Sequence, residues 1–174
     1  MAETLALEIV TPDGTKLRET VDALTAPGAD GEFGVLPRHR PLLAALTAGI
    51  LTYTKGSVTE SVAIGAGFAE VVDDKAVVLT DQFVRKDDID PVRVRLELKE
   101  VDEQLDHFAG EPTGPEYGAL VARELWAATQ LELHGDPPPP RIRSQSELEL
   151  NLVETYKKSE DDPEGTPEGG AAPH

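Results

Sequence analysis

The residues that could carry chemistry are concentrated in the stretch PGADGEFGVLPRHRPLL, residues 27–43. It places Glu32, Arg38, His39 and Arg40 among glycines, prolines and apolar side chains. A carboxylate and a histidine can exchange protons, and arginines beside a histidine can bind an anion. A shaped loop of this kind can equally be scaffold that is presented to another protein. The residue types alone leave all three alternatives open.

The four histidines do not have the spacing of a metal site. They are His39, His107, His134 and His174, and no two of them are four residues apart or belong to an HExxH motif. The chain has no cysteine, which excludes disulfides and thiolate zinc sites. We therefore expect no metal, and we interpret His39 as a structural hydrogen-bonding residue rather than a catalyst.

The motifs of nucleophilic and phosphate chemistry are missing from the sequence. There is no G-x-S-x-G elbow and no G-x-x-x-x-G-K-[ST] loop. The stretch GAGFAE, residues 65–70, begins like a dinucleotide fingerprint, but it lacks the third glycine and is followed by a strand-like pattern. We interpret its glycines as permitting a tight turn of a strand. The sequence therefore predicts no active site and no cofactor, and favours a protein that binds partners.

Composition restricts which partners are expected. The chain has 33 acidic and 16 basic residues, a formal net charge of -17. This charge disfavours nucleic acid and anionic membrane surfaces, which attract positive fields. The start, MAETLALEIV, has no basic leader, and no apolar stretch approaches the ~20 residues of a membrane-spanning helix. We expect a soluble protein with no direct membrane insertion.

Short strands and tight turns are predicted up to residue 86. TPDG at residues 11–14 has turn chemistry, since Pro presets φ and Gly accepts positive φ. Two further stretches have the form of β-hairpins, with turns at residues 55–57 (Lys-Gly-Ser) and 73–75 (Asp-Asp-Lys). Short, closely spaced strands with Gly-containing turns favour an antiparallel sandwich or barrel over a βαβ fold.

A helical pattern replaces the strands after residue 88. Asp90 followed by Pro91 is typical of a helix start, and Gly110 is expected to end this helix. A second helix is predicted from residue 115, with Gly135 as its stop. The expected apolar positions are Val94, Leu98, Val101 and Leu105 in the first helix, and Leu120, Leu125, Ala128 and Leu131 in the second. A short Gly/Pro loop should fold the pair into an antiparallel hairpin.

Three domains follow from these patterns: a β-domain at 1–87, a helical hairpin at 88–135, and an extension at 136–174. The extension opens with DPPPP, a stiff spacer. Residues 144–160 can form a short helix with Leu148, Leu152 and Tyr156 on one face, and the polar remainder is expected to be disordered. The extension either reaches a neighbouring subunit or is an unpacked acidic tail, and we favour the tail.

The segment GADGEFGVLPRHRPLLAALTAGIL, residues 28–51, resembles the signature loop of the epsilon subunit of F-type ATP synthases, called delta in mitochondria. Further similarity lies in LALEIVTPDG, VAIGAGFAEVVDDKAVVLTD and IDPVRVR, and it extends in collinear order from residue 3 to about 134. The matching loop positions are Gly31, Glu32, Phe33, Gly34, Val35, Leu36, Pro37, His39, Pro41, Leu42 and Gly49.

This resemblance implies a β-sandwich of about ten antiparallel strands followed by an antiparallel two-helix hairpin. It implies a non-catalytic subunit of the central stalk that clamps the gamma subunit, rests on the c-ring and couples rotation to proton-driven ATP synthesis. In many bacterial members the hairpin also extends along gamma and inhibits ATP hydrolysis, which would bring it to the alpha and beta subunits. The implied location is the cytoplasmic face of the bacterial inner membrane, within the peripheral part of the complex.

The resemblance assigns the c-ring contact to residues of the signature loop. These are Glu32, Phe33, Arg38, His39 and Arg40. Arg38 and Arg40 stand where the family often has small residues, so they either add contacts to the ring or are simply solvated.

Some bacterial members bind ATP on the folded hairpin, through Ile-Asp-x-x-Arg-Ala in the first helix and arginines in the second. Here Ile89, Asp90 and Arg93 match the first motif, and Arg123 is the nearest arginine in the second helix. Three positions depart from that pattern, since Val94 replaces the alanine and Trp126 and Gln130 replace arginines. The alternative is that Asp90 caps the helix and Arg93 forms a surface ion pair.

Two other classes of function are weighed against the stalk subunit. A stand-alone sugar- or peptide-binding sandwich with a dimerising hairpin would carry an aromatic-lined groove, yet the single tryptophan, Trp126, falls in the second helix. An ATP-sensing module would use the hairpin as its reporter. The resemblance favours the stalk subunit.

Overall fold

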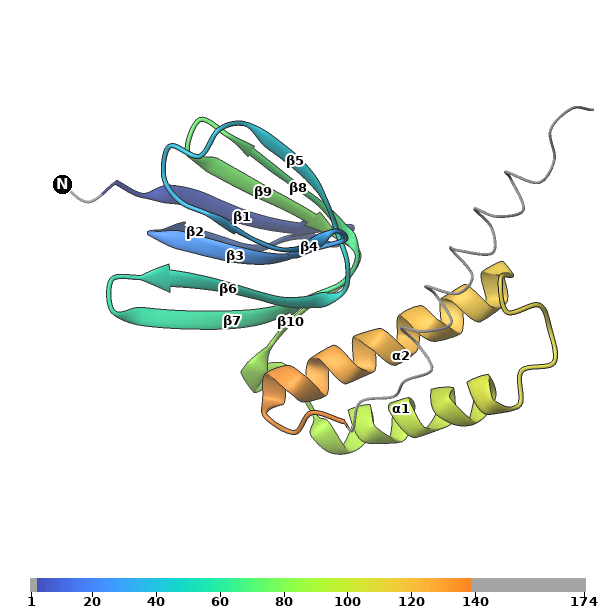
Figure 1. Ribbon diagram of the computed structural model, residues 1–174. Coiled ribbons are helices and arrows are strands. Elements are labelled where there is room, and N and C mark those ends of the chain that lie inside the picture. The colour runs from blue at the N-terminus through green and yellow to red at the C-terminus, as the bar shows by residue number, and fades with distance from the viewer. Residues whose placement is uncertain (1–2, 139–174) are drawn as a thin grey trace, which may run out of the picture. The chain divides into compact units, whose positions relative to one another are not determined.

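The computed structural model describes residues 3–138, which form ten strands and two α-helices in chain order (Figure 1). The predicted short helix at 144–160, most of the proline spacer, His174 and the acidic tail lie outside the described residues. The strands are β1 Leu5–Thr11, β2 Gly14–Val21, β3 Ala23–Gly28, β4 Gly31–Val35, β5 Leu42–Leu46, β6 Gly49–Lys55, β7 Val58–Ile64, β8 Gly67–Val72, β9 Lys75–Thr80 and β10 Phe83–Arg85. A 3-10 turn at Lys86–Asp88 leads into α1, Pro91–Asp106, and α2 follows at Pro115–His134.

The strands wrap into a sandwich whose hydrogen-bonded order is β10-β7-β6-β3-β5-β8-β9-β1-β2, with β4 paired to β3. One layer contains β10, β7, β6 and β3, and the other contains β5, β8, β9, β1 and β2. The two layers are joined where Gly28 of β3 pairs with Leu46 of β5. The predicted sandwich is confirmed, with one parallel pair, β1 with β9. These two strands are far apart in sequence, so no tight hairpin forces them to run in opposite directions.

Both predicted hairpins are confirmed. Lys55 pairs with Val58 across the β6–β7 turn, where Gly56 has a φ of 60°. Val72 pairs with Lys75 across the β8–β9 turn, where Asp73 and Asp74 have φ values of 49° and 57°. Two successive positive φ values are the signature of the type I′ turn that joins twisted strands, and aspartate tolerates that conformation.

The main core lies between the two layers and is built from aliphatic side chains. It contains Leu5, Leu7 and Ile9 from β1, Val71 from β8, Val78 from β9, and the buried Tyr53 from β6. Each of these strands buries every second residue, as the period of two requires. The low aromatic content of the sequence therefore matches a core of Leu, Ile and Val.

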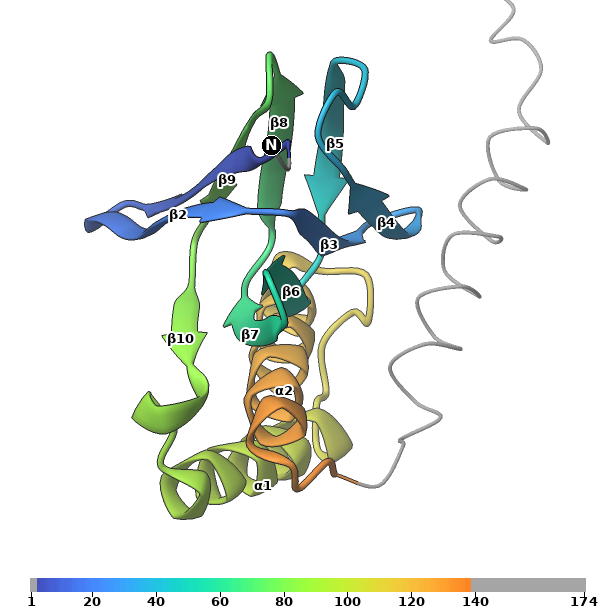
Figure 2. The ribbon, with the colours of Figure 1, turned by 90° about the vertical axis from the view of Figure 1, so that its left-hand side faces the viewer.

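A second, smaller core joins the helical hairpin to the sandwich. Leu51 and Tyr53 of β6 belong to the main core. Ile50, the residue before Leu51, packs against the second core instead. Likewise Ala63 of β7 lies in the second core and its neighbours Val62 and Ile64 in the first. The helical side of this second core consists of Ile89, Val94, Ala127, Leu131 and Leu133, with Leu98 and Trp126 at its edge. Figure 2 shows α2 lying against β6 and β7.

The hairpin begins and ends as the sequence predicts, with corrections inside it. Asp90 is the N-cap of α1, and its carboxylate accepts hydrogen bonds from the Val92 and Arg93 N–H groups at 3.1 and 3.2 Å. Gly135, with a φ of 100°, ends α2. The first helix stops at Asp106 rather than at Gly110.

One predicted core position of α2 is wrong. Leu125 is exposed, whereas Ala127 and Leu133 are buried. The sequence pattern predicts the wrong face for Leu125, because alanines and polar residues in the middle of α2 leave its apolar face ambiguous. The other predicted apolar positions are buried or half-buried.

Among residues 3–138, no helix is long and apolar enough to cross a membrane. Over the same range, no group of three or more His, Asp or Glu side chains is arranged to hold a metal ion.

A pair of glycine substitutions tests the packing of the sandwich. A Cβ at Gly67 would lie 1.9 Å from the carbonyl oxygen of Leu79, so Gly67→Ala should lower the free energy of unfolding by about 1–3 kcal/mol. The control is Gly118→Ala in α2, where a Cβ meets nothing within 4 Å and should raise the free energy by about 0.5–1 kcal/mol. Urea unfolding measures both, and equal stability of the two variants would contradict the close approach at Gly67.

Candidate functional site

The residues predicted to contact the c-ring lie in two separate parts of the structure, the strand β4 and the loop after it. Glu32 and Phe33 belong to β4, which pairs with β3 next to a tight turn at Ala29 and Asp30. Glu32 is exposed, and the half-buried Phe33 packs against the main core. Gly31 has a φ of 121°, a conformation that only glycine adopts readily, so this turn needs its glycine.

The loop between β4 and β5 contains Arg38, His39 and Arg40. A hydrogen bond attaches this loop to the β8–β9 turn. The Arg38 N–H donates to the carboxylate of Asp74, and the Arg38 guanidinium pairs with Glu3. The His39 N–H donates to the Leu36 carbonyl oxygen at 3.1 Å. Its ring Nδ1 lies 2.7 Å from the Arg40 carbonyl oxygen, an acceptor only, so the ring donates there. This supports the interpretation of His39 as a structural hydrogen-bonding residue.

The two groups lie at opposite ends of β8. Gly28 pairs with both Gly31 and Leu46, and Leu46 pairs with Gly67, the first residue of β8. Arg38 instead contacts Asp74, which lies two residues after the last residue of β8. The chain therefore does not gather the five predicted ring-contact residues into one cluster.

The four residues predicted for ATP are also separated along the hairpin. Ile89 is buried in the second core, and the Asp90 carboxylate is occupied by the N-cap, as the capping alternative predicts. Arg93 is exposed. Arg123 lies further along the hairpin, where its guanidinium is 3.7 Å from Glu97.

An apolar surface that the sequence did not single out covers the outer side of β5, β8 and β9. The pairing register sets its rows: Phe68 lies between Ala45 and Leu79, and Glu70 lies between Leu43 and Val77. Leu43, Phe68 and Leu79 are 72%, 57% and 52% exposed. We call this surface the bare face, and define it as Leu43, Ala45, Phe68, Glu70, Val72, Val77 and Leu79.

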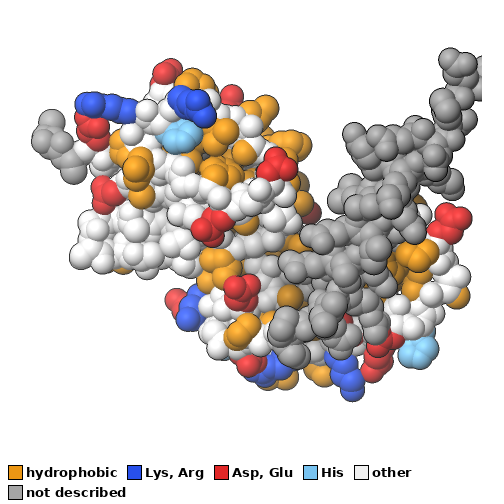
Figure 3. All heavy atoms as spheres, viewed as in Figure 1, with side chains coloured by type: hydrophobic (Ala, Val, Ile, Leu, Met, Phe, Trp, Pro, Cys, Tyr) orange, Lys and Arg blue, Asp and Glu red, His pale blue; other side chains and the backbone are white. Residues whose placement is uncertain are grey.

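The bare face and the hairpin lie on opposite layers of the sandwich. The hairpin covers β6 and β7 in one layer, and the bare face belongs to β5, β8 and β9 in the other. Figure 3 shows hydrophobic side chains at the surface of the upper part of the sandwich, near β5 and close to Lys, Arg and His side chains. Monomeric proteins rarely leave contiguous apolar surface uncovered, so this face is the best candidate for a binding surface.

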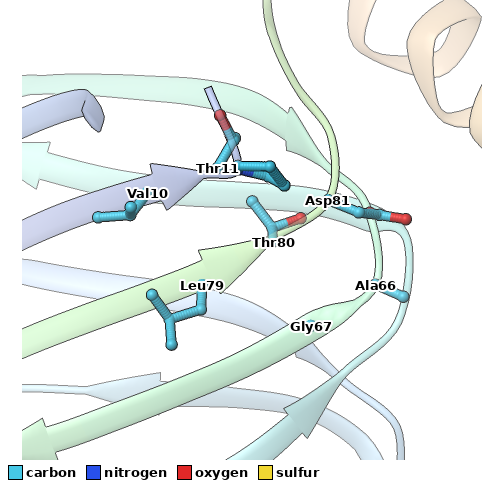
Figure 4. Close-up of a pocket in the computed structure, with 8 residues that line it drawn as sticks. Val10, Thr11, Ala66, Gly67, Leu79, Thr80 and Asp81 are labelled. Atoms are coloured by element: carbon cyan, nitrogen blue, oxygen red, sulfur yellow. The ribbon is translucent and has the colours of Figure 1, made fainter. Parts of the chain in front are cut away.

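A hollow of about 440 Å³ borders the bare face where β8 begins (Figure 4). Gly67 lines this hollow and leaves room in it, because glycine has no side chain. Val10 and Leu79 contribute apolar surface. The other lining residues are Thr11, Pro12, Ala66, Thr80 and Asp81. A partner side chain could enter this hollow without displacing any described side chain.

Charged residues on β1 and β2 continue the rows of the bare face and are already paired. Glu8 lies 2.6 Å from the Arg18 guanidinium and 3.4 Å from the Lys75 ammonium. The hydrogen bond from Arg18, aided by Lys75 and opposed by partial burial, holds the pKa of Glu8 below its usual range. Glu70 is different, because among residues 3–138 it has no hydrogen-bond or ion-pair partner.

A second polar cluster lies around β6 and stabilises the fold. The buried Tyr53 hydroxyl donates to Glu60 at 2.7 Å, and burial together with this bond raises the pKa of Tyr53. Lys55 pairs with Glu19 at 2.9 Å, and that bond raises the pKa of Lys55. These contacts tie β6 to β7 and to β2.

The signal for the bare face was present in the sequence. The alternation in GFAEVV and KAVVLT marks two-faced strands in which one face is expected to be buried. Glu70 lies on the same face of β8 as Phe68 and Val72, so the alternation indicates that this face is the outer one. It does not indicate whether the chain itself covers that outer face, because a covering element lies elsewhere in the sequence.

Comparison with known proteins identifies the relatives of this chain. Residues 4–86 match the family described as ATP synthase, Delta/Epsilon chain, beta-sandwich domain. An ATP synthase epsilon chain of Nitratidesulfovibrio vulgaris (strain DP4) is 46% identical over 114 residues, which cover 62% of this chain and 85% of the relative. ATP synthase epsilon chain 2 of Syntrophotalea carbinolica is 37% identical over 135 residues, which cover 78% and 96%.

A solved structure shares the fold. It is a chain of the cryo-EM structure of the Euglena gracilis mitochondrial ATP synthase, OSCP/F1/c-ring, with a TM-score of 0.56 and 24% identity over 86% of this chain and 81% of that chain. The sequence similarity includes the β-sandwich and, in the Syntrophotalea relative, nearly the whole length of that protein. The chain therefore belongs to the ATP synthase epsilon chain family, and it is a non-catalytic subunit of the ATP synthase.

Proposed function

We propose that the chain is the central-stalk subunit that joins the gamma subunit to the c-ring and transmits rotation during proton-driven ATP synthesis. The observation that carries this proposal is the bare face. One outer layer of the sandwich is covered by the chain's own hairpin, and the other offers exposed Leu, Phe and Val side chains. A subunit that transmits torque needs such a large, rigid contact, and a β-sheet with a packed core behind it is rigid.

The gamma subunit is the partner proposed for the bare face. Flat apolar surface with a hollow at one edge suits a stable protein partner, because its burial releases water and the hollow admits an anchoring side chain. The side chains that surround the hollow are uncharged except for Asp81. The alpha and beta subunits are proposed as further contacts of the hairpin, where Val92 and Leu96 of α1 are exposed.

The c-ring contact is proposed for the signature loop, with Glu32 and Phe33 as its leading residues. Arg38, His39 and Arg40 lie at the other end of β8. A c-ring that contacts Glu32 and Phe33 therefore does not need to contact these three residues. The ring belongs to the membrane part of the complex, so we propose that the subunit works at the cytoplasmic face of a bacterial inner membrane.

The hairpin is proposed as a detachable inhibitor of ATP hydrolysis. Its second core is small, and on the sandwich side it rests on Ala63 with the half-buried Ile50 and Val84. A contact of this size favours a domain that can release from the sandwich without unfolding it. We assign Asp90 and Arg123 to holding the hairpin together, through the N-cap and the contact with Glu97, rather than to a nucleotide.

Leu43→Asp tests gamma docking on the bare face. A carboxylate within the buried contact should weaken binding to the cognate gamma subunit at least about tenfold, because it would lose water without gaining a partner. The control is Val58→Asp in the other layer, since Val58 is similarly exposed at 54%. Calorimetric titration of both full-length variants measures the effect. Equal affinities for the two variants would exclude the bare face as the gamma site.

Charge reversal at the two ends of β8 tests the ring contact. Glu32→Lys should weaken attachment to the c-ring more than attachment to gamma, while Arg40→Glu at the other end should leave the ring contact unchanged. Both residues are exposed, so neither variant should disturb the core. Co-sedimentation with reconstituted c-ring vesicles, in the presence and absence of gamma, separates the two attachments. Loss of ring binding only in Arg40→Glu would move the contact to the loop after β4.

ATP hydrolysis by the cognate catalytic complex stripped of this subunit tests the inhibitory hairpin. The full chain and a chain ending at Asp88 are added back, and both should bind, because the sandwich with its bare face is retained. Only the full chain should slow hydrolysis. Slowing by the shortened chain would place inhibition in the sandwich, and binding without slowing by either chain would limit the role to attachment.

A further inference from the structure

Glu70 is an isolated carboxylate in the middle of an apolar surface. On its own strand it lies between Phe68 and Val72, and in the neighbouring strands it pairs with Leu43 and Val77. Its side chain is exposed, and it has no partner among residues 3–138.

The neighbouring basic residues, Lys75 and Arg18, form ion pairs with Glu8 and not with Glu70. Lys75 lies on the same side of β9 but contacts Glu8 at 3.4 Å, and Arg18 contacts Glu8 at 2.6 Å. Glu8 thus pairs with both of these basic residues. Glu70 remains the charge on the bare face that a covering partner would have to satisfy.

From this arrangement we infer that Glu70 is a specificity-determining residue for the gamma subunit, and that it pairs with a lysine or arginine of gamma. The inference rests on the proposed docking of gamma on the bare face. A partner that covers Leu43 and Phe68 also takes water from the carboxylate between them, and a carboxylate that loses water without a counter-charge is costly to bury. A gamma surface that fits the face therefore carries a cation opposite Glu70.

The surroundings of Glu70 suit the long side chain of such a residue. The aliphatic stem of a lysine or arginine can lie on the exposed Leu43 and Phe68 while its charged end reaches Glu70. Phe68 also offers the face of an aromatic ring to a cation. The same arrangement rejects an acidic or purely apolar partner, which gives the apolar surface selectivity.

Titration of full-length variants with the cognate gamma subunit tests this inference. Glu70→Lys should weaken binding about 30-fold or more, because it places two cations together. Glu70→Gln should weaken it less, and its affinity should depend less on salt than that of the unmodified chain. The control is Glu111→Lys in the loop between the helices, which makes the same change in net charge at an exposed position and should alter affinity little.

A charge swap identifies the partner residue. Lysines and arginines of gamma are changed to glutamate one at a time, and one of them should restore binding to Glu70→Lys while weakening binding to the unmodified chain. Thermal unfolding of each variant establishes that the fold is retained, as expected for a surface residue.

Three outcomes overturn the inference, and they are distinguishable. If the unmodified chain does not bind gamma, the proposed function fails and this inference fails with it. If it binds, but Glu70→Lys binds as tightly or loses no more than Glu111→Lys, only the inference about Glu70 fails. If Lys75→Met loses as much affinity as Glu70→Lys, the compensating cation belongs to this chain and not to gamma.

Discussion

The structure depends on a geometric constraint of the two-layered sandwich, which has one core between its layers and two outer surfaces. Adjacent residues of a strand point to opposite sides, so burying Leu51 and Tyr53 in the main core turns Ile50 outward, and burying Val62 and Ile64 turns Ala63 outward. Where these outward residues are apolar, covering them is favourable, because it removes apolar surface from water. On the β6–β7 layer the chain covers them with its own two helices.

The same constraint applies to the other layer, but there no described part of the chain provides the cover. Ala69 and Val71 are buried, and Phe68 and Val72 are exposed next to them. The two layers thus divide the work of the subunit. One binds the hairpin within the chain, and the other, which no described residue covers, is the surface proposed for gamma. A sandwich with a packed interior keeps both surfaces in fixed relation, which suits a protein that transmits torque.

Much of the fold could be predicted from the sequence, because its signals are local. The Asp73-Asp74 turn, the Asp90-Pro91 helix start and the Gly135 stop each depend on the conformational preferences of one or two residues, and the structure has all three. The signature loop also led to the right family. Inside α2 the local signal is weaker, because alanines and buried polar residues make the apolar face ambiguous. The pattern therefore predicts that Leu125 is buried, whereas it is exposed.

The sequence by itself determined the order of strands and helices, the main turns and the membership in a family of non-catalytic subunits. Only the tertiary structure decided that Glu32 and Arg38 lie at opposite ends of β8, and that Glu70 lies on an apolar face without a partner among residues 3–138. The physical reason is that turns and caps are set by neighbouring residues, whereas these arrangements arise from pairing between strands far apart in the chain. Alternation indicates which face of a strand is outward, as Glu70 does in β8, but only the tertiary structure shows which outward face the chain's own helices cover.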